Sequence, residues 1–271
     1  MTGALLDRWD GYAVEDLRKR WGVPLLETYR SIGSTNDRAR AIADMGGAVW
    51  STVVADEQTS GRGRQGTEWI SRPGAGLWMS LILDGDGQSG ALPVVVGLAC
   101  AEAMEEMAPA VDVGIKWPND LLIDGAKVGG VLCERSGARV VVGIGINVTG
   151  APEASAVARL GGLPPVSLEV AAGKPLSRSR LAHAITRNLR KRSDRWVAAS
   201  HGLDHASLAE LNRRDVLVGA DVQTDQAGAG RAAGIDASGA LRLVGADGVE
   251  LRVVSGGVRL APSGVPDRGE A

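Results

Sequence analysis

Arginine and glycine alternate in one short segment of the chain in a way that suits the binding of an anion. The segment DEQTSGRGRQGTEW covers residues 56–69 and places three glycines around Arg62 and Arg64. Glycine lets the backbone approach a phosphate or carboxylate closely, and two guanidinium groups supply fixed positive charge. The segment is therefore either a mobile loop that closes over an anion or a solvated, arginine-rich turn.

A second segment, IKWPNDLLIDGAKVGGVLCE at residues 115–134, holds two of the five lysines of the chain. Lys116 lies in an apolar strand, just before Asn119 and Asp120. The Asp-Gly pair that follows predicts a hairpin turn, which would return Lys127 to the Asn119–Asp120 end. The alternative for Lys116 is a lysine whose aliphatic stem covers apolar surface while its amine stays in water.

Several classes of function are disfavoured by composition. With three histidines and no HExxH or paired CxxC spacing, a histidine-based triad or zinc site is not expected, which leaves Asp, Asn and nucleotide phosphates as ligands for Mg²⁺. The segment GIGIN at 143–147 lacks the third glycine of a dinucleotide fingerprint and opens no helix. A formal charge of −2 argues against broad capture of nucleic acid or membrane.

Hydrophobic periodicity and turn residues predict mixed α and β structure. A helical lead-in is expected at 1–24, and a helix capped by Ser34 or Thr35 is expected to end at the glycines 46 and 47. The other predicted elements are strands at 25–32, 48–58 and 76–84, a helix at 92–109, antiparallel strands from 113 to 149 with a turn at Ser136-Gly137, a helix at 177–201, and four short barrel strands after 212. The tail 262–271 is expected to be disordered.

An ordered set of motifs now carries a specific resemblance. STN (34–36), EQTSGRGRQG (57–66), Trp69, KWPND (116–120), KVGG (127–130) and GIGIN resemble the biotin protein ligases, the biotin–acetyl-CoA-carboxylase ligase family, from about residue 25 to 260. The resemblance implies an α/β (α+β) fold of the class II synthetase and biotin/lipoate ligase type, with a mixed, largely antiparallel sheet and packed helices. It also implies a catalytic domain at 25–211 and a small C-terminal β-barrel at 212–261.

The resemblance implies roles for individual residues. Lys127, Arg62 and Arg64 are the implied catalytic residues, and Asp120 is the implied ligand of Mg²⁺. The implied contacts to the substrates biotin and ATP are made by Ser34, Thr35, Asn36, Gln58, Arg62, Gly63, Arg64, Trp69, Lys116, Asn119, Lys127, Gly130 and Asn147. One departure is Thr67, which stands where many bacterial members have another arginine, so that loop closure is expected to be weaker.

The implied activity is ATP-dependent formation of biotinyl-5′-AMP and transfer of biotin to a lysine of a biotin carboxyl carrier protein. A lipoate or octanoate ligase of the same wider family and a noncatalytic ligand sensor are the alternatives. Because only 33 residues precede Ser34, binding to operator DNA is not expected. A signal peptide, a membrane segment and disulfides are not expected either, which predicts a cytoplasmic protein, as a monomer or a weak homodimer.

Overall fold

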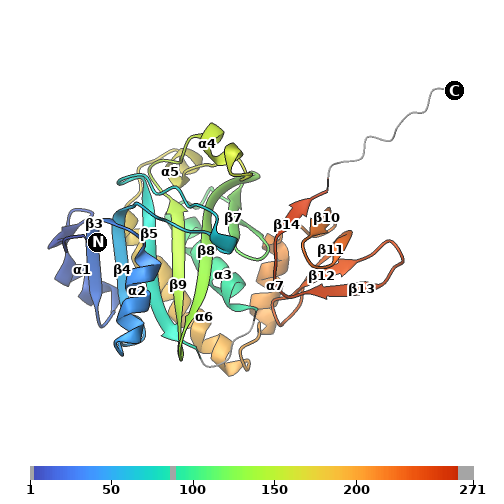
Figure 1. Ribbon diagram of the computed structural model, residues 1–271, viewed down its shortest axis with the longest axis horizontal. Helices are drawn as coiled ribbons and strands as arrows, with labels where there is room; N and C mark the ends of the chain where they lie inside the picture. Colours follow the sequence, from blue (N-terminus) through green and yellow to red (C-terminus); the bar gives the residue numbers. More distant parts are fainter. Residues whose placement is uncertain (1–2, 86–89, 262–271) are drawn as a thin grey trace.

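A seven-stranded sheet forms the centre of the computed structural model, which describes residues 3–85 and 90–261 (Figure 1). In spatial order its strands are β3 (Leu26–Ile32), β4 (Thr52–Gln58), β5 (Gly76–Asp84), β9 (Arg139–Asn147), β8 (Ala126–Ser136), β7 (Asp120–Ile123) and β6 (Gly114–Lys116). The neighbours β3 and β4 run parallel, and every other described pair in this sheet is antiparallel. The predicted mixed, largely antiparallel sheet is thus confirmed.

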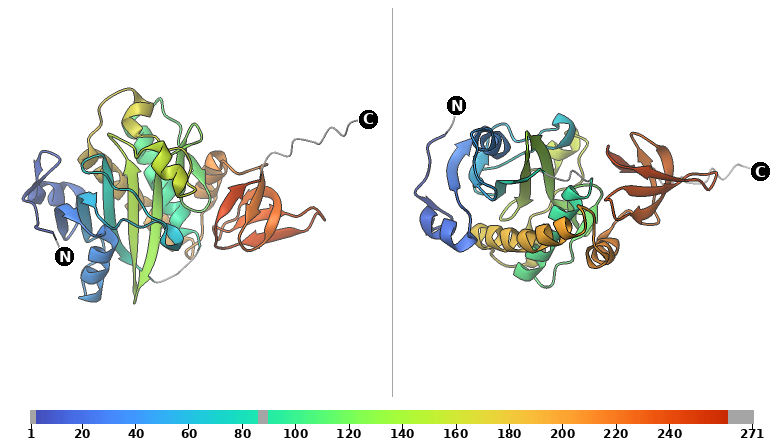
Figure 2. Two further views of the ribbon diagram at one scale, coloured as in Figure 1. Left: turned by 45° about the horizontal axis from the view of Figure 1, so that its top comes forward. Right: turned by 90° about the horizontal axis from the view of Figure 1, so that it is seen from below.

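Helices cover both faces of this sheet (Figure 2). Helix α2 (Thr35–Asp44) packs on β4, β5 and β9, where Ala39 and Ile42 meet Val53, Ile82 and Val141 in a small apolar cluster. Helices α3 (Leu92–Met107) and α6 (Arg178–Ala198) pack against each other on the opposite face. Successive residues of a strand point to opposite faces of the sheet. Because helices cover both faces, the strands at its centre are apolar at consecutive positions.

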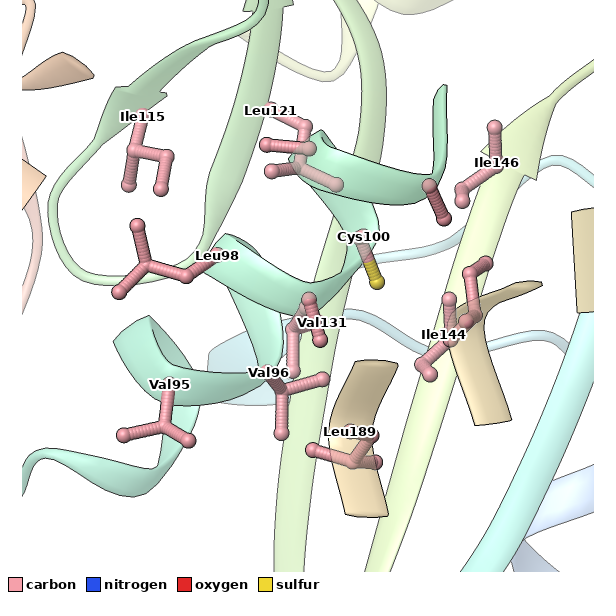
Figure 3. Packing of buried hydrophobic residues seen from close by; sticks show 14 of the residues in the cluster. Val95, Val96, Leu98, Cys100, Ile115, Leu121, Val131, Ile144, Ile146 and Leu189 are labelled. Atoms are coloured by element: carbon pink, nitrogen blue, oxygen red, sulfur yellow. The ribbon is translucent and has the colours of Figure 1, made fainter. Parts of the chain in front are cut away.

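The larger core lies on the α3 face. Val96 and Cys100 of α3 point toward Leu189 of α6 and Ile144 of β9, and Leu98 points toward Ile115, all of them buried (Figure 3). The first ten residues of α3, 92–101, are apolar around the whole circumference, as expected of a helix segment enclosed by a sheet and a second helix, and the glutamates follow only in its last turns. Cys100 and the half-buried Cys133 are free thiols, in agreement with the expectation of reduced cysteines.

The predicted helical lead-in is wrong for its first half. Residues Arg8–Trp9 (β1) and Tyr12–Ala13 (β2) form a small hairpin, and a helix, α1 (Val14–Trp21), begins only after it. The reason is the Asp10-Gly11 pair, whose φ values of 50° and 84° form a tight reverse turn. Asp10 also accepts hydrogen bonds from Ser177 and Ser179 at the start of α6, which ties the hairpin to the main body of the fold.

Other local expectations need smaller corrections. The turn between β8 and β9 consists of residues 137 and 138 rather than Ser136-Gly137, because Ser136 pairs with Arg139 in the ladder. Three helices were not predicted: α4 (Ala154–Arg159), α5 (Leu168–Ala172) and α7 (His205–Arg214). The first two have five or six residues, too few for a periodic apolar pattern to be recognised.

A separate antiparallel sheet follows α7. It contains β10 (Asp221–Thr224), β11 (Gly228–Ile235), β12 (Leu241–Val244), β13 (Glu250–Val253) and β14 (Val258–Leu260). The small C-terminal β domain is confirmed, with five strands in place of the predicted four. Pairing among the described residues runs in the open order β13-β12-β11-β10-β14, so the ladder does not close into a ring as a barrel would. The predicted disordered tail, 262–271, lies outside the described residues.

Within the described ranges 3–85 and 90–261, every helix is too short or too polar to cross a lipid bilayer.

Candidate active site

A cavity of about 350 Å³ lies between the central sheet, the 152–165 segment and the C-terminal β domain. It brings together residues from distant parts of the chain. All fourteen residues singled out from the sequence line it: Ser34, Thr35, Asn36, Gln58, Arg62, Gly63, Arg64, Trp69, Lys116, Asn119, Asp120, Lys127, Gly130 and Asn147. Such convergence of polar groups in a well-formed concavity is typical of a small-molecule site.

The start of α2 forms one wall of the cavity. Ser34 occupies the N-cap position, but its hydroxyl makes no capping hydrogen bond, contrary to the expectation for Ser34 or Thr35. Instead, the Gln58 side-chain oxygen accepts hydrogen bonds from the Thr35 amide at 2.9 Å and the Thr35 hydroxyl at 3.0 Å. The Ser34 hydroxyl therefore stays available to a ligand, at a helix N-terminus whose partial positive charge favours oxygen acceptors.

The glycines of GIGIN make room on the cavity side of β9. A Cβ atom at Gly143 would overlap the Asn36 amide, and one at Gly145 would lie 2.7 Å from Cε2 of Trp69. Both positions alternate with the core-facing Ile144. The two glycines thus let a polar side chain and an indole ring lie flat against the strand. In the sequence this segment is an incomplete dinucleotide-binding motif, whereas in the structure its glycines are required by the close packing of Asn36 and Trp69.

The glycine-arginine loop is an ordered hairpin in this structure. Its turn is closed by hydrogen bonds from Gly63 N to Thr67 O at 2.7 Å and from the Thr67 hydroxyl to Arg64 O at 2.8 Å. Gln65 has a φ of 55°, so a non-glycine residue takes the left-handed conformation that this turn requires. Thr67 therefore orders the loop, and its expected effect on closure stays a prediction.

The two loop arginines differ in their surroundings. Arg62 forms a paired ionic contact with Asp37, which raises the pKa of the guanidinium, mainly through the hydrogen bonds. Among the described residues, Arg64 forms no ion pair and donates a long hydrogen bond, from Nη1 to Asn119 Oδ1 at 3.4 Å. Burial lowers the pKa of Arg64, and attraction by Asp120 and Asp225 offsets this effect only in part. A half-buried cation in such surroundings is costly unless an anion binds there. Of the two loop arginines, Arg64 is thus the one whose guanidinium group is free to bind an anionic ligand.

Lys127 lines the cavity beside Asp120, as the predicted hairpin requires. Its Nζ is 2.6 Å from Asp120 Oδ1 and 5.3 Å from the centre of a Trp69 ring. The turn that returns it consists of Asp124 and Gly125, with φ values of 48° and 77°. Both charged side chains are largely buried, with 25% and 18% of their surfaces exposed. The ammonium group is held by a carboxylate and an aromatic face, an arrangement that fixes its position.

The C-terminal β domain completes the cavity. Lys116 Nζ donates a hydrogen bond to Val258 O at 2.8 Å, and the neighbouring Trp117 indole donates to Gly239 O at 2.9 Å. Burial lowers the pKa of Lys116. Arg259 of β14 also lines the cavity, a contribution that sequence analysis missed. No local signal could have revealed it, because Arg259 is separated from Lys116 by more than half of the chain.

Two further polar residues, Ser80 and Ser71, were not predicted from the sequence, and they contact predicted residues of the cavity wall. Ser80 is the one hydroxyl residue of β5, and its Oγ lies 2.7 Å from Thr35 Oγ1 and 2.5 Å from Asn36 Oδ1. Ser71 accepts a hydrogen bond from Gln58 Nε2 at 3.0 Å. Ser80 had a usable signal, since a lone hydroxyl inside an apolar strand needs a buried partner.

The cavity fits a metal ion only if a ligand supplies most of the coordination. The part of the chain that the structure describes holds no group of three or more His, Cys, Asp or Glu side chains suited to a metal. Asp120, the predicted ligand of Mg²⁺, lines the cavity and is paired there with Lys127. Mg²⁺ is commonly held by one or two carboxylates plus the phosphates of a nucleotide, and Asp120 suits that pattern.

Comparison with known proteins identifies relatives of this chain. Residues 36–150 match the model of the Biotin/lipoate A/B protein ligase family. A biotin–acetyl-CoA-carboxylase ligase of Mycobacterium tuberculosis is 33% identical over 225 residues, which span 78% of this chain and 78% of that protein. A ligase of the same name from Paracoccus denitrificans is 42% identical over 146 residues, 50% of this chain and 59% of the relative.

The fold has a counterpart among solved structures. The biotin protein ligase of Aquifex aeolicus, in complex with biotin and ATP, is 26% identical and superposes with a TM-score of 0.76. The match covers 88% of this chain and 100% of that one, so the similarity extends well beyond the central sheet.

Proposed function

The chain belongs to the biotin protein ligase family, and from this membership we propose that it activates biotin with ATP to biotinyl-5′-AMP and then transfers biotin to a lysine of a biotin carboxyl carrier protein. We assign the catalytic domain to residues 25–211 and propose that the β domain at residues 212–261 closes its active site. The relatives that support it are named for acetyl-CoA carboxylase, so the carrier we propose is that of an acyl-CoA carboxylase.

The observation that carries this proposal is the charge of the cavity. Five cationic side chains line it, against two acidic ones, although the whole chain has a net charge of −2. The cationic residues are Arg62, Arg64, Lys116, Lys127 and Arg259. Both substrates of the first step are anions, and their mutual repulsion is the main obstacle to bringing them together. Fixed positive charge in a partly desolvated cavity offsets that repulsion.

In the first step, a carboxylate oxygen of biotin attacks the α-phosphorus of ATP. A bond forms between that oxygen and phosphorus, the bond to the bridging oxygen breaks, and pyrophosphate leaves. The carboxylate is already ionised, so no general base is required. Lys127, between Asp120 and Trp69, is positioned to stabilise charge on the α-phosphate, and Mg²⁺, when bound with the nucleotide, would neutralise charge on the leaving pyrophosphate.

In the second step, the amine of the carrier lysine attacks the acyl carbon of the mixed anhydride. An amide bond forms, AMP leaves, and the amine loses a proton. Water competes with the lysine, so the adenylate must stay covered until the carrier docks. The hairpin that contains Arg62 and Arg64 is the element that can provide this cover.

Biotin is the proposed substrate rather than lipoate because one end of the cavity is polar. Ser34, Thr35 and Asn36 line it and are each at most 5% exposed. The ureido ring of biotin can pair with the Ser34 hydroxyl and with the Asn36 Nδ2 hydrogen that is not donated to Glu134, whereas the dithiolane ring of lipoate would leave both without a partner. Sites built to hydrogen-bond a substrate reject analogues that lack the polar group by about 10⁴-fold or more.

We therefore expect pyrophosphate release with Mg²⁺, ATP and biotin, and on the order of 10⁴-fold less with lipoate at equal concentration. The assay measures pyrophosphate first, and then the mass of a biotin carrier domain, which should gain one biotin on one lysine. Activity with lipoate and none with biotin would assign the chain to the other branch of the family. Ligand binding without pyrophosphate release would indicate a noncatalytic sensor.

The proposal further assigns the protein to the cytoplasm, as a monomer or weak homodimer with no DNA partner. A gel shift at physiological salt, with biotin and ATP present, is expected to show no sequence-specific complex with a biotin operator. The slightly acidic chain offers little of the net positive charge on which such binding depends. Submicromolar binding that distinguishes operator from scrambled DNA would contradict this expectation.

A further inference from the structure

Two carboxylates outside the cavity connect its polar end to the glycine-arginine loop. The first is Asp37, in the first turn of α2 and next to Asn36. Its Oδ2 accepts a hydrogen bond from Arg62 Nη1 at 2.7 Å, and its Oδ1 accepts one from Arg62 Nη2 at 2.6 Å. This two-point contact fixes the direction of the guanidinium plane as well as its position. Arg62 holds the pKa of Asp37 below its ordinary value, mainly through these hydrogen bonds.

The second carboxylate is Glu134 of β8, directly behind Asn36. Its Oε2 accepts a hydrogen bond from Asn36 Nδ2 at 2.7 Å and lies 4.0 Å from Arg62 Nη2. Arg40 joins the two carboxylates, with Nη2 2.9 Å from Glu134 Oε1 and Nη1 3.2 Å from Asp37 Oδ1. Asn36, Glu134, Arg40, Asp37 and Arg62 thus form a continuous series of polar contacts.

These contacts also determine which way the Asn36 amide faces. A carboxylate accepts hydrogen bonds only, so the amide nitrogen must point to Glu134 and the amide oxygen to Ser80, 2.5 Å away. One of the two Nδ2 hydrogens remains for a ligand. Asn36 lines the cavity, whereas neither Asp37 nor Glu134 does. The carboxylates therefore act on a ligand only through Asn36 and Arg62.

We propose that Asp37 and Glu134 are positioning residues that set the Asn36 amide and the Arg62 side chain together, so that the loop is latched to the same helix that holds the polar head of the ligand. This inference depends on the proposed function for the identity of that ligand. The latch itself is a property of the free protein, because it is formed by side chains of the chain alone.

Asp37→Asn tests the latch with little change in size. In the free protein, trypsin should cleave the loop after Arg62 and Arg64 about fivefold faster, because an unlatched loop adopts more of the extended conformations that a protease requires. With biotinyl-5′-AMP bound, dissociation of the adenylate should also accelerate about fivefold, while kcat for pyrophosphate release changes less than twofold. Asp37→Glu, which restores the charge, should recover part of both effects.

Asp16→Asn is the matched control, since Asp16 is an exposed acid on α1 and the same charge is lost. It should change neither rate. The double variant Asp37→Asn with Arg62→Gln should lose adenylate no faster than Arg62→Gln alone, because the same contact is already gone. Additive effects in that double variant would overturn the proposal, as would a folded Asp37→Asn protein with unchanged adenylate dissociation.

Failure of the proposed function would give a different result. If the parent protein releases no pyrophosphate with biotin and ATP, then the assignment of the ligand is wrong. The tryptic cleavage rates still test whether Asp37 holds the loop, because they need no ligand. Equal cleavage of parent and Asp37→Asn, with the same thermal unfolding midpoint, would show that no latch exists.

Discussion

Replacement of Lys127 by alanine is expected to lower the rate of adenylate formation about a hundredfold, the usual effect of losing one preorganised electrostatic contact. The structure gives two reasons. The ammonium group that would face the α-phosphate is lost, and Asp120, which is paired with it at 2.6 Å, loses its ion-pair partner, so that the cavity becomes less positive. Both changes oppose the approach of two anionic substrates. The measurement is the single-turnover rate of pyrophosphate release at saturating ATP and biotin.

Two variants separate these reasons. Lys174→Ala removes the same charge from an exposed position on the surface and should leave the rate unchanged. Lys127→Ala combined with Asp120→Asn removes the unpaired carboxylate as well. If this double variant regains nearly the full rate, then Lys127 serves to neutralise Asp120 and is not a contact of the reacting phosphate. A folded Lys127→Ala protein within about threefold of the parent would exclude both roles, since a tenfold change corresponds to only about 1.4 kcal/mol.

Replacement of Arg64 by glycine is expected to separate the two half reactions. Adenylate would still form, because Lys127 remains, but it would dissociate one to two orders of magnitude faster. Within the described part of the chain Arg64 is a half-buried cation that forms no ion pair and donates a 3.4 Å hydrogen bond to Asn119, so its main partner is expected to be the bound anion. A charge-assisted hydrogen bond contributes roughly 1.5–3 kcal/mol, which corresponds to that change in rate. The released adenylate would label lysines of bystander proteins.

The readouts are the adenylate dissociation rate and the biotinylation of albumin added to the reaction. Thr67→Val serves as a control for loop order, because it removes only the hydroxyl that donates to Arg64 O. Thr67→Arg tests whether the arginine of other family members retains the adenylate longer. If Arg64→Gly holds the adenylate as long as the parent does, Arg64 is not a contact of the closed loop and its role lies in ATP binding.

The sequence was sufficient for the parts of the fold that depend on local rules. Strand β5 was predicted at 76–84, its observed bounds, because eight largely apolar residues stand between Gly76 and Gly85. The Asp-Gly turn before Lys127 also placed that lysine correctly beside Asp120. Each of these features is encoded within about ten neighbouring residues, where periodicity and turn chemistry act directly.

Features that depend on distant partners could not be derived in this way. Gln58 replaces Ser34 as the acceptor at the start of α2, which requires β3 and β4 to lie side by side. The ion pair between Arg62 and Asp37 joins a loop to a helix 25 residues away. Only a chain already folded brings such groups together, so the motif set located the cavity but not the contacts behind its walls.

The hydrogen bond from Lys116 to Val258 spans 142 positions of the sequence, and this has a consequence for the order in which the protein is made. A polypeptide leaves the ribosome from its N-terminus, and its domains begin to fold in that order. The last strand of the central sheet ends at Asn147, long before Val258 is added. A partly synthesised chain can hence form the sheet that carries Gln58 and Lys127, with Asn36 on helix α2 beside it, while one side of the cavity is still open. Enclosure of the proposed adenylate must therefore wait until β14, which contains Val258, has been synthesised.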